Sequence, residues 1–171
     1  LFFGVWDTPY KWTQLALINP LAAGYVADFN ALMNSPGFGV GALNTRLGRA
    51  NTSSDAAFHR RESDSIQYWT PDLWGLSARL AYVIDEGRTS ATDMAAAIAP
   101  QIFSGVLAYD NGPLHLRYAA ELHQDYFGLA FLGGSPGATP ANPSSSDFGQ
   151  TAVATYTFTY SDFSTRLVGV F

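Results

Sequence analysis

The sequence has little charge, no cysteine and no long apolar run, and each of these absences excludes a class of protein. Charged residues make up 13% of the chain, about half the usual share, and of the nine basic residues only Lys11 is a lysine. That is too little charge for a typical soluble surface. The lack of cysteine excludes a disulfide framework and thiolate metal sites, and no apolar stretch is long enough for a membrane-spanning helix. The net charge of −5 argues against a nucleic-acid-binding protein.

Aromatic residues are abundant, at 15% of the chain, and many lie in segments that alternate apolar and polar residues. The alternation is strict in residues 114–123 and continues in 76–84 and 151–160. A period of two is typical of a strand with one apolar and one polar face. We therefore predict seven strands, near residues 1–6, 64–70, 75–84, 101–109, 113–123, 148–160 and 163–171.

The polar sides of these predicted strands carry charges that a dry core would not accommodate. Arg79 lies in the middle of the apolar run 76–84, and Arg117 and Glu121 share one side of the next alternating segment. Arg166 lies on the polar side of the last predicted strand, near the end of the chain. An unpaired buried charge costs several kcal/mol or more, so we expect water on this side of the strands.

Short and long connections alternate along the chain, which indicates the fold class. Turns rich in Pro, Asp, Asn and Gly separate some strands, and long segments separate the others, at 7–61, 85–100 and 124–147. Strands of about ten residues with aromatic apolar sides, short turns at one end and long loops at the other are typical of an all-β, antiparallel transmembrane β-barrel. The alternative is a soluble sandwich or lipocalin-like barrel, which would bury the apolar side and leave the arginines on the surface.

Two motifs resemble the central region of Gram-negative general-diffusion porins. The segment GVWDTPYKW (4–12) is similar to the strand end that leads into the long third loop of these porins. The segment RRESDSIQYWTPDLWG (60–75) is close to the porin pattern R-x-x-N-S-I-x-Y-x-S-P-x-F-x-G. It departs from that pattern at Asp64, which replaces Asn, at Thr70, which replaces Ser, and at Leu73, which replaces Phe.

The resemblance extends over the hairpins at 109–119 and 160–171 and implies one barrel domain over residues 1–171, part of a sixteen-stranded porin. Long loops would be external and short turns periplasmic. A bacterial barrel closes with an even number of strands, so with seven we expect an incomplete piece of a longer porin. A rival interpretation takes Phe171 as the terminal aromatic residue of an outer-membrane assembly signal.

The resemblance also implies that segment 7–61 folds into the lumen and narrows the pore. Acids of this loop would face arginines of the wall, and opposed charges would filter solutes by charge and size. Arg60 and Arg61 cannot both face inward on a regular strand, and His115 and His123 are expected to be passive lining. No catalytic residue, metal or cofactor is expected. The candidate pore-lining residues are Asp7, Asp28, Asp55, Arg60, Arg61, Asp64, Arg79, Arg117, Glu121 and Arg166.

The sequence therefore predicts an outer-membrane porin, not an enzyme, through which small hydrophilic solutes and ions diffuse passively. The expected partners are the lipid bilayer, lipopolysaccharide and further copies of the chain in a homotrimer, with no nucleic acid. The alternative is a non-transport outer-membrane barrel, either a structural or adhesive protein or a barrel hydrolase. A channel that serves as a sheath for another component would show the same pattern.

Overall fold

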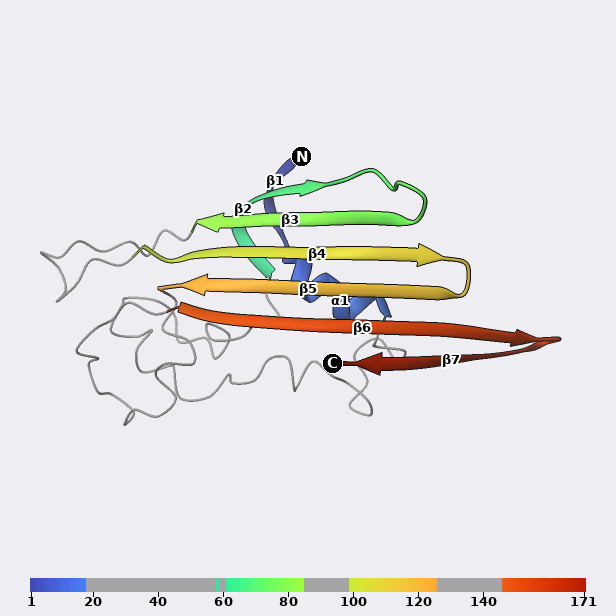
Figure 1. Ribbon diagram of the computed structural model, residues 1–171. Helices are drawn as coiled ribbons and strands as arrows, with labels where there is room; N and C mark the ends of the chain where they lie inside the picture. The colour runs from blue at the N-terminus through green and yellow to red at the C-terminus, as the bar shows by residue number, and fades with distance from the viewer. Residues whose placement is uncertain (18–57, 59–60, 85–98, 126–145) are drawn as a thin grey trace, which may run out of the picture.

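The computed structural model describes residues 1–17, 58, 61–84, 99–125 and 146–171, which form one antiparallel sheet with a helix against it (Figure 1). Strands that follow each other in the chain are neighbours in the sheet, in the order β1 to β7. All seven predicted strands are confirmed, with ends that differ by at most three residues. The elements are β1 (Phe2–Asp7), α1 (Pro9–Leu17), β2 (Arg61–Trp69), β3 (Leu76–Ile84), β4 (Gln101–Asn111), β5 (Leu114–Gln124), β6 (Ser146–Tyr160) and β7 (Phe163–Val170).

Three tight turns join the strand pairs β2–β3, β4–β5 and β6–β7 at the same end of the sheet, on the right in Figure 1. In the first turn, Oδ1 of Asp72 accepts a hydrogen bond from the Gly75 N–H at 2.9 Å. Gly75 has a φ of 87°, and a Cβ there would overlap the carbonyl oxygen of Asp110. Only glycine fits this position, as the Pro- and Gly-rich turn sequence predicts.

The strand register separates polar from apolar side chains. Paired residues on adjacent strands point to the same side, and the register aligns Ala81 with Ser104 and Ser104 with Glu121 on one side. The next positions align Leu80 with Gly105 on the other side. We call these sides the polar face and the apolar face. The buried polar residues of the polar face are Ser65, Gln67, Ser104, Arg117, Glu121, His123, Thr151 and Thr155.

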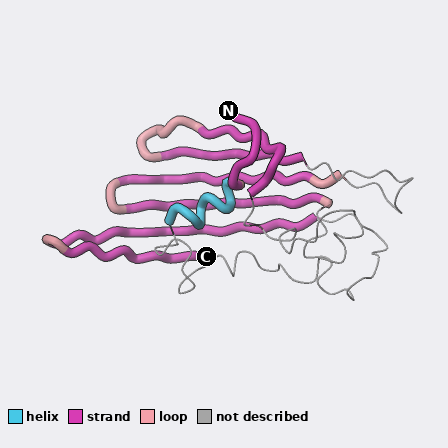
Figure 2. The backbone as a smooth tube through the Cα atoms, turned by 180° about the vertical axis from the view of Figure 1, so that it is seen from behind, coloured by secondary structure: helices cyan, strands magenta, loops and turns pink. Residues whose placement is uncertain are grey.

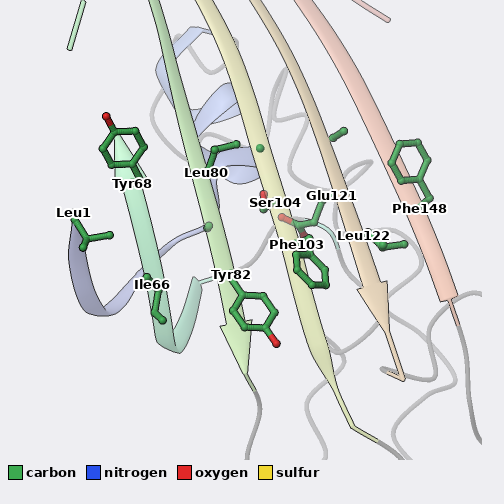
Figure 3. Close-up of a pocket in the computed structure, with 13 residues that line it drawn as sticks. Leu1, Ile66, Tyr68, Leu80, Tyr82, Phe103, Ser104, Glu121, Leu122 and Phe148 are labelled. Atoms are coloured by element: carbon green, nitrogen blue, oxygen red, sulfur yellow. The ribbon is translucent and has the colours of Figure 1, made fainter. Parts of the chain in front are cut away.

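The apolar face carries large hydrophobic side chains that the described part of the chain leaves uncovered. Leu80 is 57% and Leu107 is 52% exposed. Figure 3 shows Leu80, Phe103 and Phe148 of this face, which line a groove together with Gly105 and Ala120. Soluble monomers rarely expose an apolar surface of this extent. The soluble-sandwich alternative requires this side to be buried, and the described residues do not bury it.

Tyrosines with hydrogen-bonded hydroxyls lie towards both ends of the strands on the apolar face. At one end the Tyr82 hydroxyl donates to Oε1 of Gln101 at 2.8 Å. At the turn end Nδ2 of Asn111 donates to the Tyr109 hydroxyl at 2.9 Å. A ring with a polar tip suits the boundary between an apolar and an aqueous medium, so the apolar face has a polar rim at each end.

Helix α1 differs from the sequence prediction, which treated residues 7–61 as loop. Its start follows ordinary helix rules: Oγ1 of Thr8 accepts a hydrogen bond from the Lys11 N–H at 3.3 Å, and Pro9 occupies the first helical position. The Thr-Pro pair is a start signal that was present in the sequence. No helix in the described part of the chain is long and apolar enough to cross a membrane.

Candidate functional site

Helix α1 lies against the polar face, where it contacts strands β3 to β6 (Figure 2). The backbone N–H of Tyr10 donates to Oγ of Ser104 at 3.1 Å, and Tyr10 is buried in a cluster with Val106 and Ala119. Phe58 belongs to the same cluster, and its ring centroid lies 5.7 Å from that of Tyr10. Two separate parts of the segment 7–61 therefore pack on the polar face.

Glu121 and His123 of β5 form a polar pair beneath Phe58. Both side chains are 0% exposed, and Nε2 of His123 lies 2.7 Å from Oε1 of Glu121. The Phe58 ring stacks on the imidazole with a centroid distance of 4.4 Å and an interplanar angle of 20°. Gly149 makes room for this ring, since a Cβ at position 149 would lie 2.8 Å from its carbons. Phe58 therefore closes the pair off from solvent.

Tyr10 adds no charge to this cluster at neutral pH. Burial and, to a smaller extent, the nearby Glu121 carboxylate raise the pKa of its hydroxyl to about 12. A phenol with this pKa stays protonated over the physiological range. The charged groups of the polar face are therefore the carboxylates, the arginines and any protonated histidine.

Arg79 lies between Trp69 of the polar face and Trp12 of helix α1. Its Cζ is 3.5 Å from the ring centroid of Trp12 and 4.0 Å from that of Trp69. Trp69 is the cross-strand partner of Arg79 on β2, and Trp12 belongs to α1. We call these three residues the Trp–Arg clamp. Each contact of a cation with an indole face contributes about 0.5–2 kcal/mol, which holds the guanidinium in place.

Arg117 also lies over the Trp12 ring, with Cζ 5.0 Å from its centroid, but it is held in addition by an acid and by carbonyl groups. Its Nη2 lies 2.8 Å from Oδ2 of Asp110, and its Nη1 donates to the Leu116 carbonyl oxygen at 2.9 Å. The other carboxylate oxygen of Asp110 lies 2.5 Å from Nδ1 of His115. The charge of Arg117 is therefore compensated within the β4–β5 hairpin, whereas no described carboxylate compensates that of Arg79.

Asp7 lies near two basic side chains where β1 meets α1. Its Oδ1 is 2.8 Å from Nζ of Lys11, and its Oδ2 is 4.0 Å from Nη1 of Arg61. Arg61 also lies over the Trp6 ring, with Cζ 6.0 Å from the centroid. The structure thus brings together Asp7, at the end of β1, and Arg61, at the start of β2.

The remaining candidate pore-lining residues are spread more widely. Arg166 is exposed on β7 and shares the polar face with its partner Thr157. Asp64 is exposed, with a φ of 56°, where the register of β1 and β2 shifts. In the described ranges, no group of three or more His, Asp and Glu side chains could hold a metal ion. Asp28, Asp55 and Arg60 lie outside the described residues.

Sequence reasoning missed the aromatic residues of the polar face, because it placed aromatic residues on the apolar side. The Trp69 ring centroid lies 4.8 Å from that of Phe2 and 5.8 Å from that of Trp6. Trp69 follows the polar residues Ser65 and Gln67 by four and two positions, and this even spacing along a strand places all three on one face. That signal could have located Trp69. No comparable signal relates Trp12 of the helix to Arg79.

Gly149→Ala should be destabilising only while Phe58 is present. The added Cβ would lie 2.8 Å from the Phe58 ring carbons, so the ring must leave its place over His123. We expect a cost of about 2 kcal/mol in the free energy of unfolding, measured by urea titration in lipid vesicles. In the Phe58→Ala background the same substitution should cost almost nothing. Equal costs in the two backgrounds would show that Phe58 does not pack over Gly149.

Comparison with known proteins identifies one family. The family model described as Gram-negative porin matches residues 3–167, a range that contains β2 to β6 completely and most of β1 and β7. No curated protein and no solved structure is significantly similar to the chain. The family resemblance of the motifs at 4–12 and 60–75 is thereby confirmed. The chain belongs to the Gram-negative porin family and is a protein of the bacterial outer membrane.

Proposed function

We propose that the chain forms part of the wall of a water-filled channel through which small hydrophilic solutes and ions diffuse passively. The observation that carries the proposal is the division of the sheet into two faces. The apolar face exposes large hydrophobic residues such as Leu80 and Leu107, and the polar face carries Arg79, Arg117 and Glu121. Lipid would cover the first face and water in the lumen would solvate the second. Passive diffusion of this kind requires no catalytic residue.

We propose that the segment 7–61 narrows this channel. The contacts of α1 with β3 to β6 support the proposal, as does the packing of Phe58 on His123. In an adhesive or structural barrel, a long segment would instead extend away from the wall. The constriction would combine the charges near α1 with those of the wall; the proposed pore-lining residues are Asp7, Asp28, Asp55, Arg60, Arg61, Asp64, Arg79, Arg117, Glu121 and Arg166.

We further propose that the seven strands belong to a larger barrel of sixteen strands that assembles as a homotrimer. Strands β1 and β7 are the two edges of the sheet, and an edge strand leaves backbone groups available for pairing with a further strand. The apolar face would contact bilayer lipid, lipopolysaccharide and neighbouring subunits. The family resemblance supports the strand number and the trimer, and the uncovered apolar face agrees with both.

Arg79→Glu should shift the ion preference of the channel towards cations. The substitution reverses a charge that no described carboxylate compensates, beside the helix that would narrow the pore. Reversing a charge several ångströms from a passing ion in water changes its energy by about 1 kcal/mol, so we expect a roughly fivefold change in permeability ratio. The reversal potential of single channels in a planar lipid bilayer under a KCl gradient measures this ratio, with the full native protein.

Arg166→Glu is the matched control, because it reverses the same charge on the same face but at an exposed position of β7. We expect a smaller shift. A bilayer that stays silent after verified insertion would contradict the channel. Open channels with an unchanged reversal potential in Arg79→Glu would leave the channel intact and contradict the placement of Arg79 at its constriction.

A further inference from the structure

The Trp–Arg clamp presents hydrogen-bond donors that have no acceptor in the described part of the chain. Arg117 donates to Asp110 and to the Leu116 carbonyl, but no described residue accepts a hydrogen bond from Arg79. Its guanidinium contacts the rings of Trp12 and Trp69. An indole face attracts the cation as a whole, and the N–H groups at the edge of the guanidinium stay available for a ligand.

The clamp is rigid because each of its parts is held by a separate contact. Nε1 of Trp69 donates to Oε1 of Gln67 at 3.2 Å, and Nε2 of Gln67 donates to the Asp7 carbonyl oxygen at 3.1 Å. Trp12 packs against the buried cluster under α1. Arg79 itself extends from β3 opposite Trp69. A donor group that is ordered before binding loses less conformational entropy when a ligand arrives.

The chemistry of this donor group selects a planar anion. A guanidinium presents pairs of parallel N–H donors in one plane, which match the two oxygens of a carboxylate. The charge of Arg117 is already compensated by Asp110, whereas no described carboxylate lies within ion-pair distance of Arg79. The clamp therefore provides one positive charge that Trp12 and Trp69 hold in orientation and that no described carboxylate compensates.

We propose that the Trp–Arg clamp is a binding site for the carboxylate of a small organic acid that passes through the channel. The proposal rests on the proposed function, since it requires the polar face to line the lumen. Arg79 would bind the carboxylate with two parallel hydrogen bonds, and Trp12 and Trp69 would hold the guanidinium in that orientation. The channel would then select organic anions in two ways, through this saturable binding site and through the electrostatic field of its charged lining residues.

Calorimetric titration of the detergent-solubilised full protein with succinate tests the site, with the uncharged succinamide as the control ligand. We expect saturable binding of succinate alone. Arg79→Gln should weaken it at least about tenfold, because a charge-assisted hydrogen-bond pair is lost. Arg79→Lys should also weaken it, since an ammonium keeps the charge but lacks the planar edge. Arg166→Gln removes the same charge from the polar face outside the clamp and should weaken succinate binding much less than Arg79→Gln.

Two results of the titration would overturn the site. Either the wild-type protein does not bind succinate, or Arg79→Gln and Arg166→Gln weaken binding equally, which would indicate general electrostatic attraction. Single-channel currents separate this failure from that of the channel. If the channel conducts in KCl but its current in potassium succinate does not saturate as the succinate concentration rises, the site is contradicted and the channel is not. Absence of conductance in both salts would contradict the channel and, with it, the role of the clamp in transport.

Discussion

His123→Leu should lower the free energy of unfolding by about 3–5 kcal/mol, because it leaves the carboxylate of Glu121 buried without its partner. Both side chains are 0% exposed and lie 2.7 Å apart, and Oε2 of Glu121 has no hydrogen-bond partner among the described residues. The carboxylate therefore depends on the imidazole for the interaction that offsets its loss of hydration. Urea unfolding in lipid vesicles, followed by tryptophan fluorescence, measures the change.

The matched control replaces both members of the pair. Glu121→Leu combined with His123→Leu removes the buried carboxylate together with its partner, and replacing both partners of a buried interaction by apolar groups can be nearly neutral. We therefore expect the double variant to be more stable than His123→Leu alone. If the cost of the double variant equals the sum of the costs of Glu121→Leu and His123→Leu, an energetic coupling between Glu121 and His123 is contradicted.

Leu167→Arg should destabilise the protein by about 2–4 kcal/mol, the cost of an arginine on the lipid side of an outer-membrane strand near the bilayer midplane. Leu167 lies in the middle of β7, 58% exposed, and pairs with Tyr156 on the apolar face. Lipid cannot hydrate a guanidinium, so the side chain must bend towards an interface or carry water with it. Folding into vesicles at increasing urea concentration measures the cost.

The adjacent residue supplies the control at the same depth. Val168 is 43% exposed and pairs with Thr155 on the polar face. Val168→Arg introduces the same side chain on the same strand but on the polar face, which water would solvate in the proposed channel, so we expect a cost below about 1 kcal/mol. Similar costs for the two variants would contradict the assignment of lipid to the apolar face.

Much of the fold could be predicted because its signals are local. Alternation along a single strand places Arg79 and Leu80 on opposite sides, and this holds whatever the strand pairs with. The turns at 70–75 and 110–113 could also be predicted from local sequence, because Gly75 and Gly112 have the positive φ angles that such turns require. Helix α1 was missed because its nine residues were interpreted within a long loop, although Thr8 and Pro9 marked its start.

The candidate site could be predicted only as a set of residues, because its pairings are distant in the chain. Arg117 and Glu121 were expected on one face and lie there. Nothing in the sequence indicated that Arg79 would contact Trp12 rather than an acid. The contact depends on the docking of α1, which is fixed by a hydrogen bond between Tyr10 and Ser104, 94 residues apart.

The sequence by itself determined the alternation of the strands, the tight turns, the two opposed faces and the porin family. Each of these follows from neighbouring residues or from a pattern of neighbouring residues. Only the tertiary structure decided which polar groups meet: Phe58 with His123, and Arg79 with Trp12 and Trp69. The physical reason is that the register between strands and the docking of a helix on the sheet depend on the packing of the whole sheet, which no short segment encodes.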